Sequence, residues 1–150
     1  MTKVSKSSSR PPLWKVWVTA SRPHTLTASV SPVLVGYNVG LVLIENVEKD
    51  SYFWLTMKWA AFCMLIQLGT NLHNDYADFV KGADTDKRVG QARATQKGWL
   101  TPFQTASAAS LVLTLALLLG IGFIKDVQED IQHFRLMIVI VATSIFNAFA

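Results

Sequence analysis

Long blocks of apolar residues constrain this chain more than any other feature of its sequence. Between Leu26 and Ile44 nearly every residue is apolar or small, and similar blocks cover residues 52–74 and 103–124. A bilayer core of about 30 Å needs about 20 apolar residues in a helix, so each block is long enough to cross it. With 51% hydrophobic residues, the chain is also too apolar for an ordinary soluble domain. The sequence therefore predicts an all-α integral membrane helical bundle.

A fourth apolar segment opens at Phe134 and runs to the last residue, Ala150. Residues 136–150 are too few to cross about 30 Å comfortably, and no cap or flanking charge follows them. We therefore expect three full transmembrane helices and the start of a fourth, in a domain over residues 13–150 that is incomplete at its C-terminus. Residues 1–12 contain three basic residues, four serines and two prolines, which predicts a disordered basic tail.

Several local signals place the ends of these helices. Residues 13–20 mix two tryptophans with a lysine, which is typical of an amphipathic helix lying in the membrane interface. Pro23 suits the first turn of the next helix with Ser21 as its cap, and Pro32 predicts a kink or a local opening inside that helix. Thr101 and Pro102 predict the cap and first turn of the third span.

The positive charges alternate between the two sides of the predicted membrane. The segment up to Arg22 carries five lysines and arginines, and the long polar loop over residues 75–102 carries another five. The loop at 45–51 carries only Lys49, and the one at 125–135 only Lys125 and Arg135. Because Lys and Arg accumulate on the cytoplasmic side, we expect the N-terminus and the 75–102 loop on the cytoplasmic or stromal side. Arg22 would then emerge beside the start of the long loop.

A group of amides and carboxylates ends the second apolar block. At about 100° per residue, Asn71, Asn74, Asp75 and Asp78 fall within about 100° of arc on one helix face, whereas His73 points away. Carboxylates stacked at this spacing repel one another unless a cation lies between them. Hard oxygen ligands of this kind suit Mg²⁺, which usually combines one or two carboxylates with phosphate oxygens. This face therefore predicts half of a site for a Mg²⁺-bound phosphate or diphosphate.

The loop that follows supplies cations that complement such a site. Arg88, Arg93 and Lys97 can neutralise the phosphate charge that Mg²⁺ leaves exposed. Carboxylates, a divalent ion and guanidinium groups around a diphosphate would stabilise it as a departing anion. An apolar tunnel between the neighbouring helices would suit a long hydrocarbon chain.

These residues resemble a known family. The segment Asn74-Asp75-Tyr76-Ala77-Asp78 resembles the first aspartate-rich motif of the UbiA superfamily of membrane prenyltransferases. The longer segments 74–85 and 88–98, together with residues 21–29 and 32–36, resemble the 1,4-dihydroxy-2-naphthoate prenyltransferases of menaquinone and phylloquinone synthesis. The resemblance covers about residues 20–105, and the loop is its most specific part.

The resemblance implies a bundle of about nine transmembrane helices around a central cavity. It implies Mg²⁺-dependent transfer of a polyprenyl or phytyl group from its diphosphate to 1,4-dihydroxy-2-naphthoate, in a lipid bilayer. By position, Asn74 and Asp78 match the amide and first carboxylate of the superfamily motif and are the catalytic candidates. Asp84 matches the naphthoate subgroup, so the implied metal ligands are Asn74, Asp75, Asp78 and Asp84. Arg93, Lys97 and Arg22 are the candidates for binding prenyl diphosphate, and a second aspartate-rich motif is absent from the sequence.

Other functions stay open at this level. Homogentisate or hydroxybenzoate are alternative acceptors within the same chemistry. A divalent-cation transporter would place its carboxylates near the bilayer midplane, whereas these lie at a helix end beside a basic loop that repels cations. A catalytically inactive fragment with a structural role is the third alternative. We expect no nucleic acid among the partners.

Overall fold

Helices account for the whole regular structure of the described chain. The computed structural model describes residues 10–45, 48–83, 93–126 and 130–149, and within these ranges it contains helices and no strand. The predicted all-α class is therefore confirmed. The tail at residues 1–9 and the candidate ligand Asp84 lie outside the described residues. The five helices are α1 (Leu13–Ser21), α2 (Pro23–Leu43), α3 (Lys49–Val80), α4 (Pro102–Asp126) and α5 (Ile131–Phe149).

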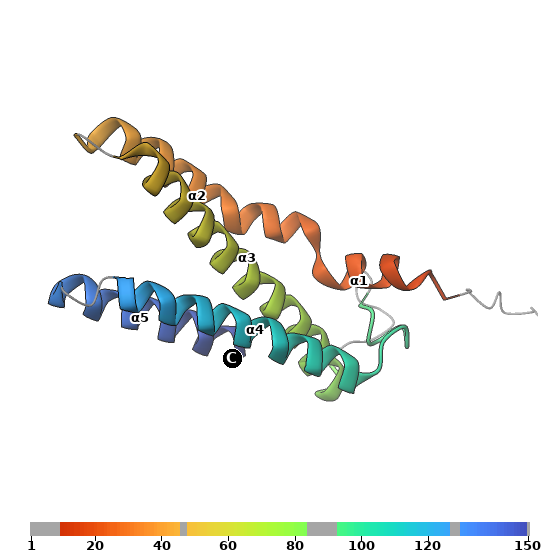
Figure 1. The fold of residues 1–150 in the computed structure, drawn as a ribbon. Helices are drawn as coiled ribbons and strands as arrows, with labels where there is room; N and C mark the ends of the chain where they lie inside the picture. The colour runs from red at the N-terminus through yellow and green to blue at the C-terminus, as the bar shows by residue number, and fades with distance from the viewer. Residues whose placement is uncertain (1–9, 46–47, 84–92, 127–129, 150) are drawn as a thin grey trace, which may run out of the picture.

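The longest helix, α3, is the centre of the bundle. It packs against α1, α2, α4 and α5, and the only other helix pairs in contact within the described chain are α1 with α2 and α4 with α5. Figure 1 shows α2 and α3 running side by side, with α4 and α5 packed together on the other side of α3. The short helix α1, the last turns of α3, the loop before α4 and the first turn of α4 gather at one end. The predicted polar site lies at this end.

Three helices of the described chain are long and apolar enough to cross a membrane, by length and composition: α2, α4 and α5. Helix α5 has 19 residues because it starts at Ile131, three residues before the predicted Phe134. The start is fixed by Asp130, whose Oδ1 accepts hydrogen bonds from the backbone N–H groups of Gln132 and His133. The expectation that this segment is too short to cross is therefore corrected. Helix α3 contains the predicted span at residues 52–74 but is not one of these three, and it carries polar residues at both ends.

Proline and threonine place two of the helix starts as predicted. At α4, the Thr101 hydroxyl accepts from the Gln104 N–H, and the Gln104 side-chain oxygen accepts from the Thr101 N–H. Helix α2 starts at Pro23 and runs continuously through Pro32. The predicted cap at Ser21 is wrong: its hydroxyl donates to the Val18 carbonyl inside α1. The cap position of α2 is occupied by Arg22, whose backbone has a left-handed φ of 51°.

Two groups of buried apolar side chains hold the helices together. The first, which we call the loop-side cluster, joins α1, the loop, α3 and α4 through Val16, Ala20, Leu72, Ala94, Leu100 and Ala109. The second, the aromatic cluster, joins α3, α4 and α5 through Phe62, Ala116, Phe123 and Val141 with Trp59 beside them. Because residues 93–95 and Leu100 are all buried, this loop is anchored in the core at both ends, while Lys97 and Gly98 between them are exposed.

Candidate functional site

The acidic motif lies on the last turns of α3. We expected the polar loop to begin at residue 75, but the helix continues to Val80 and ends in a turn at Lys81 and Gly82. Gly82 has a φ of 66°, which a glycine adopts without strain, and the Ala83 N–H closes the end by donating to the Asp78 carbonyl at 2.9 Å. The motif is thus helical throughout, and Asp75 and Asp78 lie one turn apart on the same face.

The Asp75 carboxylate is buried and held on one side by the loop. Its exposed fraction is 2%, and its Oδ2 accepts from both the backbone N–H and the hydroxyl of Thr95, at 3.3 and 3.1 Å. Its other oxygen, Oδ1, is buried and accepts no hydrogen bond from the described residues. Burial raises the pKa of the Asp75 carboxyl, while the Thr95 hydrogen bonds and the charges of Arg93 and Arg22 act to lower it. One buried acceptor atom of Asp75 is therefore left without a hydrogen bond from the described residues.

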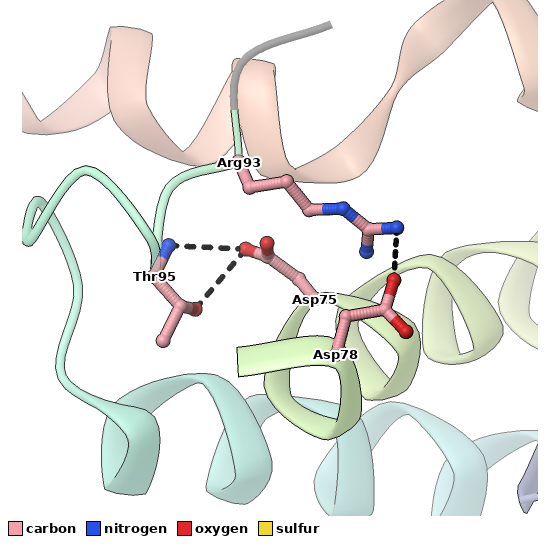
Figure 2. Close-up of polar contacts among 4 residues, drawn as sticks. All are labelled: Asp75, Asp78, Arg93 and Thr95. Atoms are coloured by element: carbon pink, nitrogen blue, oxygen red, sulfur yellow. Dashed lines mark hydrogen bonds and ion pairs between the residues drawn. The ribbon is translucent and has the colours of Figure 1, made fainter. Parts of the chain in front are cut away.

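Asp78 is joined to the loop by an ion pair. The Arg93 guanidinium contacts an Asp78 carboxylate oxygen, and the two side chains are 5% and 30% exposed. In Figure 2 the Arg93 side chain extends past Asp75 to reach Asp78, while Thr95 approaches Asp75 from the other side. Arg93 thus lies at the acidic face, as a candidate phosphate contact should. Lys97 follows on an exposed turn, where its N–H donates to the Arg93 carbonyl at 3.0 Å.

A third basic residue approaches from the junction of α1 and α2. Arg22 occupies that junction, and its charge is one of those that act to lower the pKa of the Asp75 carboxyl. Asn71 fixes the junction, since its Nδ2 donates to the Ser21 carbonyl at 2.9 Å and to the Thr25 hydroxyl at 2.8 Å. Asn71 is therefore engaged in holding α2 against α3. The junction that carries Arg22 thus lies against α3 one helical turn before Asp75, at the end of the bundle that holds the acidic motif.

Asn74 and His73 lie on different faces of α3. Asn74 is half-buried on the motif face, and no hydrogen bond joins its side chain to another residue in the described part of the chain. Its amide is thus available to a ligand as far as the described residues go. His73 points elsewhere, as predicted, because its ring packs at 5.2 Å from the Phe149 ring of α5.

The donor set fits a magnesium ion that is shared with a phosphate ligand. No group of three or more His, Cys, Asp or Glu side chains gathers among residues 10–45, 48–83, 93–126 and 130–149, so these ranges alone hold no full protein cage for a metal. Asp75 and Asp78 with the Asn74 amide supply a few hard oxygen atoms on one face, and the buried Oδ1 of Asp75 is open. Mg²⁺ is commonly held by one or two carboxylates together with phosphate oxygens and water.

Two residues of this site escaped the sequence analysis. Thr95 and Thr105 are 2% and 0% exposed, and their hydroxyls lie 2.8 Å apart. Threonines in a loop and in a first helical turn carry no periodic signal. The hydrogen bond from Thr95 to Asp75 spans 20 residues of sequence, so only the packing of the loop reveals it.

The fold and the site together define an integral membrane protein of bundled helices, whose acidic helix end meets a basic loop. No protein-family model and no solved structure matches the sequence. Curated relatives do match it. The 1,4-dihydroxy-2-naphthoate octaprenyltransferase of Bacillus subtilis is 36% identical over 120 residues, or 80% of this chain. The enzymes of the same name from Mycobacterium tuberculosis and Escherichia coli are 32% and 28% identical, over 70% and 89% of this chain.

These matches confirm the resemblance found in the loop and motif sequence. The chain is a relative of the 1,4-dihydroxy-2-naphthoate octaprenyltransferases. It spans 36%, 34% and 42% of the lengths of the three relatives named. A match over 120 of the 150 residues necessarily includes the acidic end of α3 and the basic loop.

Proposed function

We propose that this protein takes part in Mg²⁺-dependent transfer of a polyprenyl or phytyl group from its diphosphate to 1,4-dihydroxy-2-naphthoate, a step of menaquinone or phylloquinone synthesis. The observation that carries the proposal is the cluster at the end of α3, where Asp75 and Asp78 meet Arg93 and the charge of Arg22. The names of the relatives supply the choice of acceptor. Homogentisate and hydroxybenzoate are the acceptors against which this choice is tested.

In this proposal the acidic residues of the cluster bind the metal ion and the basic residues bind the diphosphate. Asn74, Asp75 and Asp78 would hold Mg²⁺, and Asp84 would join them from the segment between α3 and the loop. Mg²⁺, when bound, would neutralise diphosphate charge and so favour departure of the diphosphate. Arg93, Lys97 and Arg22 would bind the diphosphate oxygens that remain. A guanidinium buried to 5% exposure, as that of Arg93 is, interacts with an anion more strongly than one in water.

An apolar groove beside the cluster suits the hydrocarbon part of the donor. A groove of about 320 Å³ between α2 and α3 is lined by Leu26, Thr27, Val30, Ser31, Leu34 and Met64. It starts next to Thr25, whose hydroxyl accepts from Asn71, one helical turn before Asp75. A prenyl chain whose diphosphate lies at Asp75 and Asp78 would therefore find apolar surface directly behind the charged end. Lipid in place of water around such a surface would favour attack by the aromatic ring on the developing allylic cation.

The proposed setting is the membrane surface. We place the N-terminus and the loop on the cytoplasmic or stromal side, because Lys and Arg are concentrated in both. A soluble diphosphate group could reach the cluster from that side while its tail stays in the bilayer. A cation transporter fits less well, because the Arg93 guanidinium lies against Asp78 and would repel a passing cation.

The test is an assay with the protein at its full natural length in membranes, with Mg²⁺, labelled prenyl diphosphate and one acceptor at a time. We expect transfer to dihydroxynaphthoate that is lost with EDTA and falls at least about 100-fold in Asp78→Ala, since a group that stabilises the departing anion is worth about that much. Asp50→Ala is the matched control, an exposed acid at the other end of α3. Transfer by Asp78→Ala at the parent rate would reject the proposal, and preference for homogentisate or hydroxybenzoate would replace the acceptor.

A further inference from the structure

The proposed function leaves two buried hydroxyls unused. Thr95 belongs to the loop and Thr105 to the first turns of α4, and both are almost completely inaccessible. A buried hydroxyl is unfavourable unless it is hydrogen-bonded. These two are bonded to one another at 2.8 Å and, through Thr95, to Asp75 of α3. Three separate elements are therefore tied together at a single point.

The direction of these hydrogen bonds follows from the number of protons available. An ionised carboxylate only accepts, so the single hydroxyl proton of Thr95 goes to Asp75 Oδ2. Thr95 Oγ1 must then accept, and the proton in the 2.8 Å contact comes from Thr105. Thr105 also lies 3.2 Å from the Thr101 carbonyl, a longer contact that its proton shares at most in part. The chain of donors thus runs from Thr105 through Thr95 to Asp75.

This arrangement fixes two groups of the site together. Asp75 Oδ2 accepts from two donors of one residue, which restrains rotation of the carboxylate and leaves Oδ1 without a hydrogen bond from the described residues. Arg93 lies two residues before Thr95. The hydrogen bond of the Thr95 backbone therefore also fixes the loop backbone from which the Arg93 side chain extends toward Asp78. Figure 2 shows both contacts arising from the same short stretch of loop.

We propose that Thr95 is a positioning residue which, held by Thr105, sets the Asp75 carboxylate and the Arg93 guanidinium for binding of the prenyl diphosphate. The proposal rests on the proposed function for the identity of the ligand. Thr95 itself touches no ligand in this scheme and acts through its two partners. Residues that orient ligand-binding groups commonly change affinity about 10-fold to 100-fold when they are replaced.

The first experiment measures amide hydrogen exchange in residues 93–101 of the full-length protein. In Thr95→Val, which keeps the shape and removes the hydroxyl, we expect these amides to exchange about 10-fold faster, whereas Thr95→Ser stays close to the parent. Thr105→Val should show a smaller acceleration in the same segment. Thr114→Val is the matched control, because its hydroxyl bonds only within α4, to the Ser110 carbonyl, and lies far along the helix. Unchanged exchange in Thr95→Val overturns the proposal.

The second experiment measures binding of farnesyl thiolodiphosphate with Mn²⁺, read from the Mn²⁺ spin-resonance signal, together with steady-state kinetics. We expect Thr95→Val to weaken donor binding and raise the KM for the donor about 10-fold, with the KM for the acceptor unchanged and both restored in Thr95→Ser. Faster exchange with unaltered donor binding would make Thr95 merely structural and overturn the proposal. Failure of the parent to transfer a prenyl group would reject the proposed function alone, since donor binding is measured without transfer.

Discussion

The two clusters that join α3 to α4 are built in different ways. The aromatic cluster holds the helices by packing: the rings of Trp59 and Phe123 stack at 4.4 Å with an angle of 3° between them, and Phe62 meets Phe123 edge-on. At the other end, the side chains of the loop-side cluster are mostly small, and directed contacts from Asp75 and Arg93 lie beside them. Helices α3 and α4 are therefore joined by apolar packing in the aromatic cluster and by hydrogen bonds and charge at the polar end of α3.

The difference separates stability from binding. Ring packing removes a large apolar area from water, and for that reason it supplies stability. Hydrogen bonds and ion pairs lose strength with small displacements, and a buried polar group without a partner is unfavourable. A charged cluster therefore adds little to stability on its own but holds ligand-binding atoms in fixed places. Changes in the aromatic cluster should affect stability first, and changes at the polar end should affect binding first.

The largest effect on stability is expected for Phe123→Ala. Removing a ring that is 2% exposed leaves a cavity between α3, α4 and α5 and should cost about 3 kcal/mol, while prenyl transfer per folded molecule stays within about twofold. Thermal unfolding in detergent measures the first and the transfer assay the second. Phe103→Ala on the same helix is the control, since that ring is 80% exposed. Equal loss of stability in both variants would contradict the comparison.

The largest effect on activity is expected for Arg93→Gln. The change keeps a polar side chain but shortens it and removes the charge beside Asp78, so kcat/KM for the prenyl diphosphate should fall about 100-fold, or about 2.7 kcal/mol. In Arg93→Lys, kcat/KM should lie between the values of the parent and of Arg93→Gln, because an ammonium group keeps the charge but lacks the planar fork of donors. The melting temperature should fall less than in Phe123→Ala. If Arg93→Gln transferred the prenyl group at the parent rate, the assignment of donor binding to this end of the molecule would be wrong.

An intermediate effect is expected for Asn71→Ala, which should change both stability and donor binding. Asn71 is 3% exposed and donates to two oxygen atoms at the junction of α1 and α2, so its loss should cost about 2 kcal/mol. Because the junction carries Arg22, the KM for the donor should also rise severalfold. Asn38→Ala is the control, since its amide donates only within α2, to the Leu34 carbonyl. A loss of stability with an unchanged KM would show that Arg22 does not act on the donor.

The smallest effect is expected for Gly120→Ala in the aromatic cluster. A Cβ there would lie 2.7 Å from Val141 Cγ1 and 3.3 Å from a Phe62 ring carbon. The steric cost of about 2 kcal/mol is offset by the better helix propensity of alanine, which leaves a net loss of about 1 kcal/mol. At Gly122 nothing lies within 4 Å, so Gly122→Ala should raise stability by up to about 1 kcal/mol. Thermal unfolding that gives both variants the same sign would falsify this account of the packing.

Helix class, the first residues of α2 and α4 and the face of the acidic motif were accessible from the sequence. Apolar blocks, the Thr101 and Pro102 start of α4 and the spacing of Asp75 and Asp78 depend on neighbours within a few residues. The end of α3 was placed too early because polar residues read as a loop, whereas Asp75 and Asp78 are held by partners in the 93–101 segment that stabilise them on a helix. The same limit explains why Ser21 was assigned as a cap when Arg22 occupies that position.

By itself, the sequence determined that this protein is a bundle of apolar helices with acidic and basic residues close together along the chain. These properties depend on composition and periodicity, which act over one or two helical turns. Only the tertiary structure decided which acid meets which base, that Thr95 holds Asp75, and that Asn71 carries the α1–α2 junction. Such pairings join residues 15 to 50 positions apart (Arg93 with Asp78, Thr95 with Asp75, Asn71 with Ser21), and they form only after helix packing has brought the segments together.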